Sequence, residues 1–143
     1  MVMSFPIGID MPNDFPTLAH NNVTGKLGTH QRHALWPECA AGWNAVARRF
    51  FAAAKADDLF TGSITKNGAG PAVDERQIQE EALFVFFVAG LSAIESLAYT
   101  LYAVGAILQP GHFPMSLPGH FKAINPSQIH PGSICHLLCG LAC

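Results

Sequence analysis

The longest apolar stretch of the chain covers residues 82–108 and contains one charged side chain, Glu95. A helix that is apolar around most of its circumference is buried, either inside a protein or in a membrane. About 20 apolar residues span a hydrocarbon core, so this stretch is long enough to cross one. The pattern predicts a long helix, and whether protein or lipid covers it is the main functional question.

Local signals predict that this helix runs from residue 74 to residue 108. Asp74 can cap its first turn, Gln77 can complete a capping box, and Pro110 stops the hydrogen-bond ladder at the other end. Residues 83–88 are apolar without interruption and are expected to be buried on nearly all sides. In the second half, side chains at helical spacing predict a polar stripe: Ser92, Glu95, Ser96, Tyr99 and Tyr102.

An amphipathic pattern predicts another long helix over residues 36–60. Its apolar positions recur at steps of three and four: Trp36, Cys39, Trp43, Val46, Phe50, Ala53 and Phe60. Pro37 suits the first helical turn, where its missing N–H would have no partner, and Gly62 marks the expected stop. The predicted fold is therefore all-α, with a helical hairpin core over residues 36–108.

The two ends of the chain lack this periodicity. Residues 1–35 hold three prolines and many polar residues, and we expect them to form an irregular N-terminal arm. Residues 109–143 hold five of the ten prolines and are compatible only with a short helix at their end. Because two helices bury only one face each, we expect the hairpin to complete a bundle by dimerisation.

Composition and charge narrow the class of function. The chain is 50% hydrophobic and 13% charged, so it is rich in residues that can form a core and poor in charge. Its net charge of −2 provides no basic surface for nucleic acid. The N-terminus lacks the charged and apolar regions of a secretion signal, so we expect a cytoplasmic location.

The alternative is a single-pass protein with residues 82–108 across the inner or plasma membrane. Between residues 83 and 101, Leu, Ile, Phe and Val side chains favour insertion by about 3–6 kcal/mol in total, and Glu95 with neighbouring hydroxyl groups removes most of that gain. The polar stripe suits a helix bundle better than lipid. We therefore expect a protein–protein interaction or assembly module that binds itself or another helical protein through Leu97, Leu101 and Val104.

Glu95 is the first candidate for a functional residue, together with Ser92, Ser96 and Tyr99. A carboxylate inside an apolar segment is a functional-site candidate, because a buried charge needs a partner. No second acid or histidine lies at a helical step from it, and the serines lack the glycine pattern of a hydrolase nucleophile. The sequence therefore does not favour an enzyme.

Two groups of residues carry side chains that can ligate metals. Cys135, Cys139 and Cys143 are spaced by four and would share one helix face, which cannot surround a metal tetrahedrally. His30 and His33 lie at the entrance of the first predicted helix and could bind a transition metal with help from a nearby acid. Packed cysteines and solvated histidines are the favoured interpretation, and no cofactor is predicted.

The hairpin resembles the core of HEPN-type helical proteins, in which a loop joins two long helices and the second carries an acid in an apolar stretch. Some members of that family cut RNA through an Arg-x4-6-His motif, which this chain lacks. Residues 123–143 hold no charged side chain, which is unusual for the surface of a folded domain. A further alternative is therefore a shortened or frame-shifted HEPN-like protein whose third and fourth helices are missing. On that hypothesis an intact relative diverges near Asn125 and continues with another helical pair.

Overall fold

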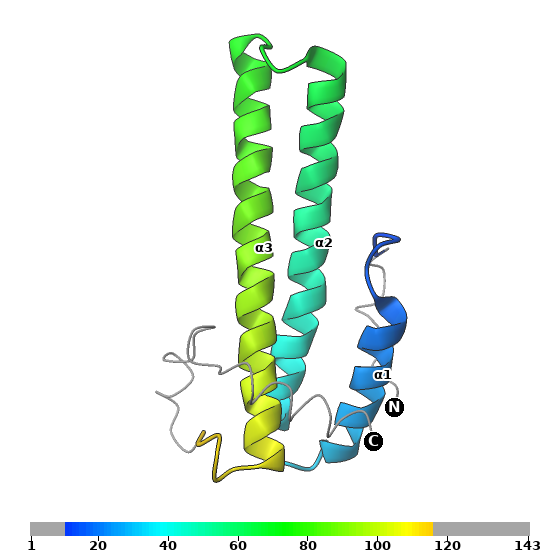
Figure 1. Ribbon diagram of the computed structural model, residues 1–143, viewed down its shortest axis with the longest axis vertical. Helices are drawn as coiled ribbons and strands as arrows, with labels where there is room; N and C mark the ends of the chain where they lie inside the picture. The colour runs from blue at the N-terminus through cyan, green and yellow to red at the C-terminus, as the bar shows by residue number, and fades with distance from the viewer. Residues whose placement is uncertain (1–10, 116–143) are drawn as a thin grey trace.

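The computed structural model of the protein describes residues 11–115. This part of the chain forms α1 (Thr17–Leu27), a short 3-10 helix (Gly28–His30), α2 (Trp36–Asn67) and α3 (Val73–Leu108). The two long helices lie antiparallel and side by side, and α1 lies beside the N-terminal half of α2 (Figure 1). The predicted all-α fold with a helical hairpin is confirmed.

The second helix is longer than predicted, because it continues through Gly62 to Asn67 instead of ending near residue 60. One glycine inside a helix lowers stability by about 1 kcal/mol, which tertiary contacts can offset. Gln79 of α3 supplies such a contact by donating a hydrogen bond of 3.1 Å to Oγ of Ser63. The helix ends at Asn67, and the next residue, Gly68, has a φ of +72° that only glycine adopts readily.

The third helix begins at Val73, with Ala72 at its N-cap position and no side-chain cap. The predicted capping role of Asp74 is therefore wrong. Asp74 and Glu75 lie in the first turn instead, where carboxylates interact favourably with the positive end of the helix dipole. The side-chain amide of Asn67 donates to Glu75 at 2.9 Å and joins this turn to the end of α2.

Residues 17–27 form a helix, although the sequence predicted an irregular arm. An isolated helix of this length is marginal in water, so packing on α2 must stabilise it. The Phe15 ring lies 5.1 Å from that of Phe50, and the His20 ring stacks at 4.7 Å on Trp43. The indole N–H of Trp43 also donates a hydrogen bond of 2.9 Å to Oγ1 of Thr24. These contacts are tertiary and leave no periodic signal in the arm.

The apolar core lies at the base of the hairpin, where α1, the start of α2 and the end of α3 meet. Its buried members are Leu27, Cys39, Ala103, Val104, Ala106, Phe113 and Met115. The chain folds back after α3, so that the Phe113 ring covers Gly105, where an added Cβ would lie 2.7 Å from it. Farther from this base, α2 and α3 are the only described helices (Figure 1).

Small and polar side chains make the contact between α2 and α3. Four buried residues of α3 recur every seven positions: Ala82, Ala89, Ser96 and Ala103. On α2, Gly42 allows a close approach, because a Cβ there would lie 2.5 Å from Oγ1 of Thr100. Such a seam brings the backbones together but covers only a narrow part of the α3 circumference.

Candidate functional site

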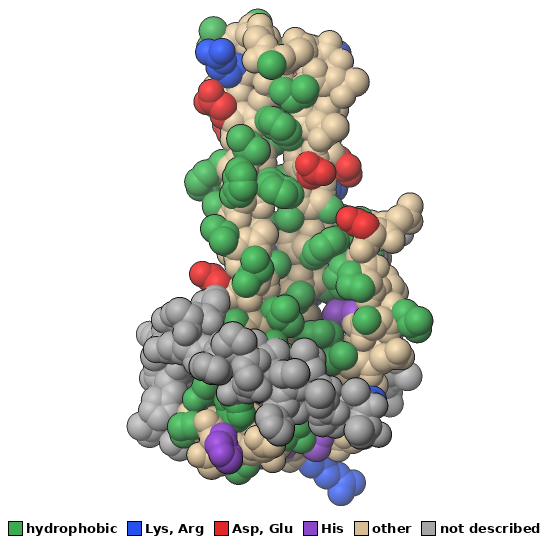
Figure 2. Space-filling model, viewed as in Figure 1, with side chains coloured by type: hydrophobic (Ala, Val, Ile, Leu, Met, Phe, Trp, Pro, Cys, Tyr) green, Lys and Arg blue, Asp and Glu red, His purple; other side chains and the backbone are tan. Residues whose placement is uncertain are grey.

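The main surface feature is a row of large apolar side chains on α3. Its members, called here the α3 stripe, are Phe84 (69% exposed), Phe87 (57%), Leu91 (63%) and Ile94 (58%). Only 11% of the most apolar 18-residue window of α3 is buried. Apolar side chains extend along the hairpin in Figure 2. The prediction that residues 83–88 are buried on nearly all sides is therefore wrong for the single chain.

The α3 stripe lies on the side of α3 that points away from α2. The four residues of the stripe are separated by three, four and three positions. Because an α-helix has about 3.6 residues per turn, this spacing keeps their side chains on one face. On the same geometry Ala82, Ala89 and Ser96 fall on the opposite face, and those residues are buried against α2. A partner can therefore reach the stripe without displacing α2.

Apolar and charged side chains border the α3 stripe. Leu83, Val88 and Leu97 flank it and are themselves partly exposed. The bordering charged residues are all exposed: Arg76, Glu80 and Glu81 before the stripe, and Glu95 at its end. By length and composition, α3 is also the one described helix that could cross a membrane. The stripe thus combines a large apolar area with few charges.

An apolar groove of about 430 Å³ lies between α2 and α3, near the loop end of the hairpin. Its walls come from both long helices: Phe51, Ala52, Lys55, Ala56, Leu59, Ile78, Glu81, Ala82 and Val85. Among the residues that the structure describes, Lys55 and Glu81 are the only charged ones in these walls. This groove extends the apolar surface from α3 onto α2.

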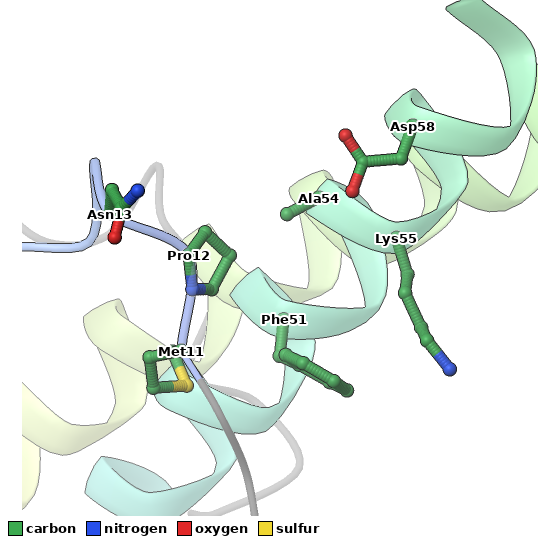
Figure 3. A pocket seen from close by; sticks show the side chains of 7 residues that line it. All are labelled: Met11, Pro12, Asn13, Phe51, Ala54, Lys55 and Asp58. Carbon is green, nitrogen blue, oxygen red and sulfur yellow. The ribbon is translucent and has the colours of Figure 1, made fainter. Parts of the chain in front are cut away.

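A smaller hollow of about 370 Å³ lies between the N-terminal segment and α2 (Figure 3). Its lining is more polar: Met11, Pro12, Asn13, Phe51, Ala54, Lys55 and Asp58. In Figure 3 the side chain of Lys55 points away from Met11 and Pro12, and that of Asp58 lies on the next turn of α2. These side chains do not converge on a common point, as a ligand-binding site would require.

The four predicted functional residues do not form one site. Glu95 is exposed, so the apolar enclosure that made it a candidate is absent. Ser96 is buried, donates to the carbonyl oxygen of Ser92 at 2.8 Å and accepts a hydrogen bond from Arg49. The same Arg49 nitrogen donates to the carbonyl oxygen of Ser92 at 2.8 Å. Ser92 and Ser96 therefore join α3 to α2, through an arginine that sequence reasoning had not connected with them.

The fourth candidate, Tyr99, also faces α2. Its hydroxyl group donates a hydrogen bond of 2.7 Å to the carboxylate of Glu38. Burial, followed by the hydrogen bond and the negative charge of Glu38, raises the pKa of the Tyr99 hydroxyl. The tyrosine remains protonated at neutral pH and acts as a hydrogen-bond donor between the two helices.

The predicted metal ligands are only partly within the described residues. Nδ1 of His33 accepts a hydrogen bond of 3.1 Å from the backbone N–H of Leu35, which occupies one of its ring nitrogens. His30 lies in the 3-10 helix, and residues 11–115 contain no group of three or more His, Cys, Asp or Glu that could hold a metal ion. Cys135, Cys139 and Cys143 lie outside the described residues.

The residues predicted to form an interface have different environments. Leu97 is 37% exposed and lies at the border of the α3 stripe, whereas Leu101 is half-buried. Val104 is 3% exposed and belongs to the core at the base of the hairpin. The accessible apolar surface is therefore centred nearer the start of α3 than the sequence predicted.

Comparisons with known proteins place no further constraint on the site. No protein-family model matches the chain, and no curated protein or solved structure is significantly similar to it. Function must therefore be inferred from the chemistry of the exposed surface.

Proposed function

We propose that this protein is an assembly module that binds another protein surface through the α3 stripe. The observation that carries the proposal is the exposure of Phe84, Phe87, Leu91 and Ile94 on one face of a helix. Contiguous apolar patches on soluble proteins mark interaction sites, and helices with such a row of anchors are a common form of them. The described residues support no catalytic arrangement around Glu95, so binding is the proposed activity.

Burial of the stripe would supply enough free energy for association. Full burial of one Leu, Ile or Phe side chain contributes about 1.5–3 kcal/mol. Four such side chains, each more than half exposed, contribute several kcal/mol before the entropy of association is subtracted. The flanking Leu83, Val88 and Leu97 add to this total.

The membrane alternative has support in the length of α3, but the hairpin geometry opposes it. Arg49 contacts α3 at Ser92 and Ser96, so the middle of α2 lies beside the middle of the apolar segment. Five charged and exposed side chains lie in that part of α2: Arg48, Arg49, Lys55, Asp57 and Asp58. Each would cost up to about 3 kcal/mol at the centre of a bilayer, which exceeds the gain of about 3–6 kcal/mol from α3. This balance supports a cytoplasmic assembly protein.

Sedimentation velocity of the full-length protein in detergent-free buffer tests the proposal. We expect an assembly that Leu91→Glu dissociates, because the carboxylate would lose its water in the interface. Leu59→Glu is the matched control, since Leu59 on α2 is also 63% exposed but lies outside the stripe. Recovery of the protein from membranes by detergent alone, and not by carbonate, would overturn the proposal in favour of a membrane span.

A further inference from the structure

We infer that the α3 stripe binds the α3 helix of a second copy of this chain, in parallel orientation. The inference rests on the proposed assembly function and specifies its partner. Two observations carry it: the heptad spacing of the stripe and the charges at its borders.

The α3 stripe has the spacing of a two-helix seam. Steps of three, four and three place Phe84 and Leu91 at the a positions of a heptad, and Phe87 and Ile94 at the d positions. Ala82, Ala89 and Ser96 then occupy the f positions, opposite the seam, and all three are buried against α2. One heptad pattern thus assigns small residues to the contact within the chain and large residues to the contact between chains.

The flanking positions fit a parallel pair. In parallel helices a residue at g lies beside the e residue five positions later on the other helix. Leu83 at g therefore meets Val88 at e of the second copy, and both are partly exposed apolar side chains in the single chain. Their contact widens the seam on both sides.

The charges at the two borders of the stripe favour the parallel orientation over the antiparallel one. Arg76 at g meets Glu81 at e of the second copy in a parallel pair, which gives one attractive contact at each border. An antiparallel pair that sets Phe84 opposite Ile94 brings Glu81 and Glu95 of different copies to the same border. These two like charges repel each other, so the same four apolar residues are better paired in the parallel orientation.

Glu80 marks where the apolar seam begins. It takes the d position before Phe84, and in a parallel pair the two Glu80 carboxylates face each other. Arg76, one turn earlier on the same helix, lies where it can offset this repulsion. The apolar contact therefore starts at Phe84 and continues to Ile94.

The resulting arrangement is a row of four long helices, α2 and α3 of each copy, and not a closed four-helix bundle. Because α2 lies opposite the stripe, the two α3 helices are central and the two α2 helices are outside. The groove lined by Phe51, Leu59 and Val85 is on the side of this row and remains open. This differs from the bundle expected from helix number alone.

Disulfide trapping of the full-length protein tests the orientation. In the parallel pair residue 94 faces its own equivalent, so Ile94→Cys should form a disulfide between two chains under mild oxidation. In the antiparallel pair the two residues 94 are separated by about 15 Å along the helix axis, which no disulfide can bridge. Mass spectrometry identifies the linked peptides, because the chain has four native cysteines. Leu59→Cys, similarly exposed but on α2, is the control and should form no disulfide between chains at position 59.

A mass of two chains with a bond between the two cysteines introduced at position 94 supports the inference. The opposite result is a two-chain mass in which only the Phe84→Cys, Ile94→Cys double variant cross-links, between positions 84 and 94. That result overturns the parallel orientation but leaves the assembly function intact. A monomer, or a four-chain mass, overturns the pairing with a second copy. Circular dichroism of each variant confirms that a negative result does not reflect loss of helix.

Discussion

Gly42 of α2 lies so close to Thr100 of α3 that an added Cβ would be 2.5 Å from the threonine Oγ1. Thr100 is fully buried and donates a hydrogen bond of 2.7 Å to the carbonyl oxygen of Ser96, so it cannot move away freely. The glycine at this point sets the distance between the two long helices.

We expect Gly42→Ala to lower the free energy of unfolding by about 1–3 kcal/mol, because overpacking outweighs the better helix propensity of alanine. Gly62→Ala is the matched control on the same helix, where an added Cβ meets nothing within 4 Å. That change should raise stability by about 0.5–1 kcal/mol. Equal effects of the two substitutions in chemical denaturation would contradict the close contact at Gly42.

The stability of the protein should fall in mildly acidic solution because of His20. Burial lowers the pKa of His20, although hydrogen bonds with Trp43 and Asn21 act in the opposite direction. The folded state therefore favours neutral histidine, whereas the unfolded chain binds a proton near the ordinary pKa of about 6.5. The contribution of His20 to the free energy of unfolding is therefore complete above that pKa and decreases as the pH falls below it.

The measurement is the free energy of unfolding at about pH 7.5 and about pH 5.5, on either side of the histidine range. We expect the decrease to be smaller in His20→Phe, which keeps a ring against Trp43 but cannot be protonated. His33→Gln, at an exposed position, should retain the decrease of the native chain. An unchanged decrease in His20→Phe would show that another group is responsible.

Arg48 and Arg49 are adjacent and both exposed. Within the described residues, Arg49 donates hydrogen bonds to Ser92 and Ser96 of α3, and no such hydrogen bond is seen for Arg48. We expect Arg49→Ala to lower the free energy of unfolding by about 0.5–1.5 kcal/mol, since solvent weakens a hydrogen bond from an exposed cation. Arg48→Ala should change it by less than about 0.5 kcal/mol. Chemical denaturation of the two variants side by side checks the difference, and a larger effect at Arg48 would refute it.

The proposed parallel pair makes a prediction for the charges at its borders. Arg76→Glu places a second acid opposite Glu81 of the other copy and should weaken dimerisation about two- to tenfold. The double variant Arg76→Glu, Glu81→Arg exchanges the two charges and should restore most of the affinity. Sedimentation equilibrium at low and high salt measures both effects, which should shrink as salt rises. No recovery in the double variant would argue against this pairing.

Much of the fold was predictable from local patterns. The apolar run and the amphipathic run each extend over several turns, so their periodicity predicts two long helices and the hairpin between them. The end of α2 was predicted too early because one glycine, Gly62, was treated as a stop. The short α1 was missed because Trp43 and Phe50 of another helix stabilise it, and such contacts do not appear in the sequence of the arm.

The candidate site was predictable only in part. The sequence singled out the apolar segment of α3 and named its single acid, Glu95, as the first functional candidate. Its prediction that residues 83–88 are buried is wrong for the single chain. The spacing of apolar residues along a helix predicts that one face is buried, but it does not identify the element or the partner that buries it. Arg49 and Glu38, which bind the serine and tyrosine of the polar stripe, lie more than 40 residues away in the chain.

The sequence by itself determined that the chain forms long helices, because helical periodicity is a local property of spacing and side-chain type. Only the tertiary structure decided which side of α3 faces α2, since that choice depends on small residues of both helices fitting together. Ala82, Ala89 and Ser96 allow α2 to approach closely, whereas Phe84 and Leu91 are too large for that seam. Close packing therefore turns the large apolar side chains outward, and their exposure is the observation on which the proposed assembly function rests.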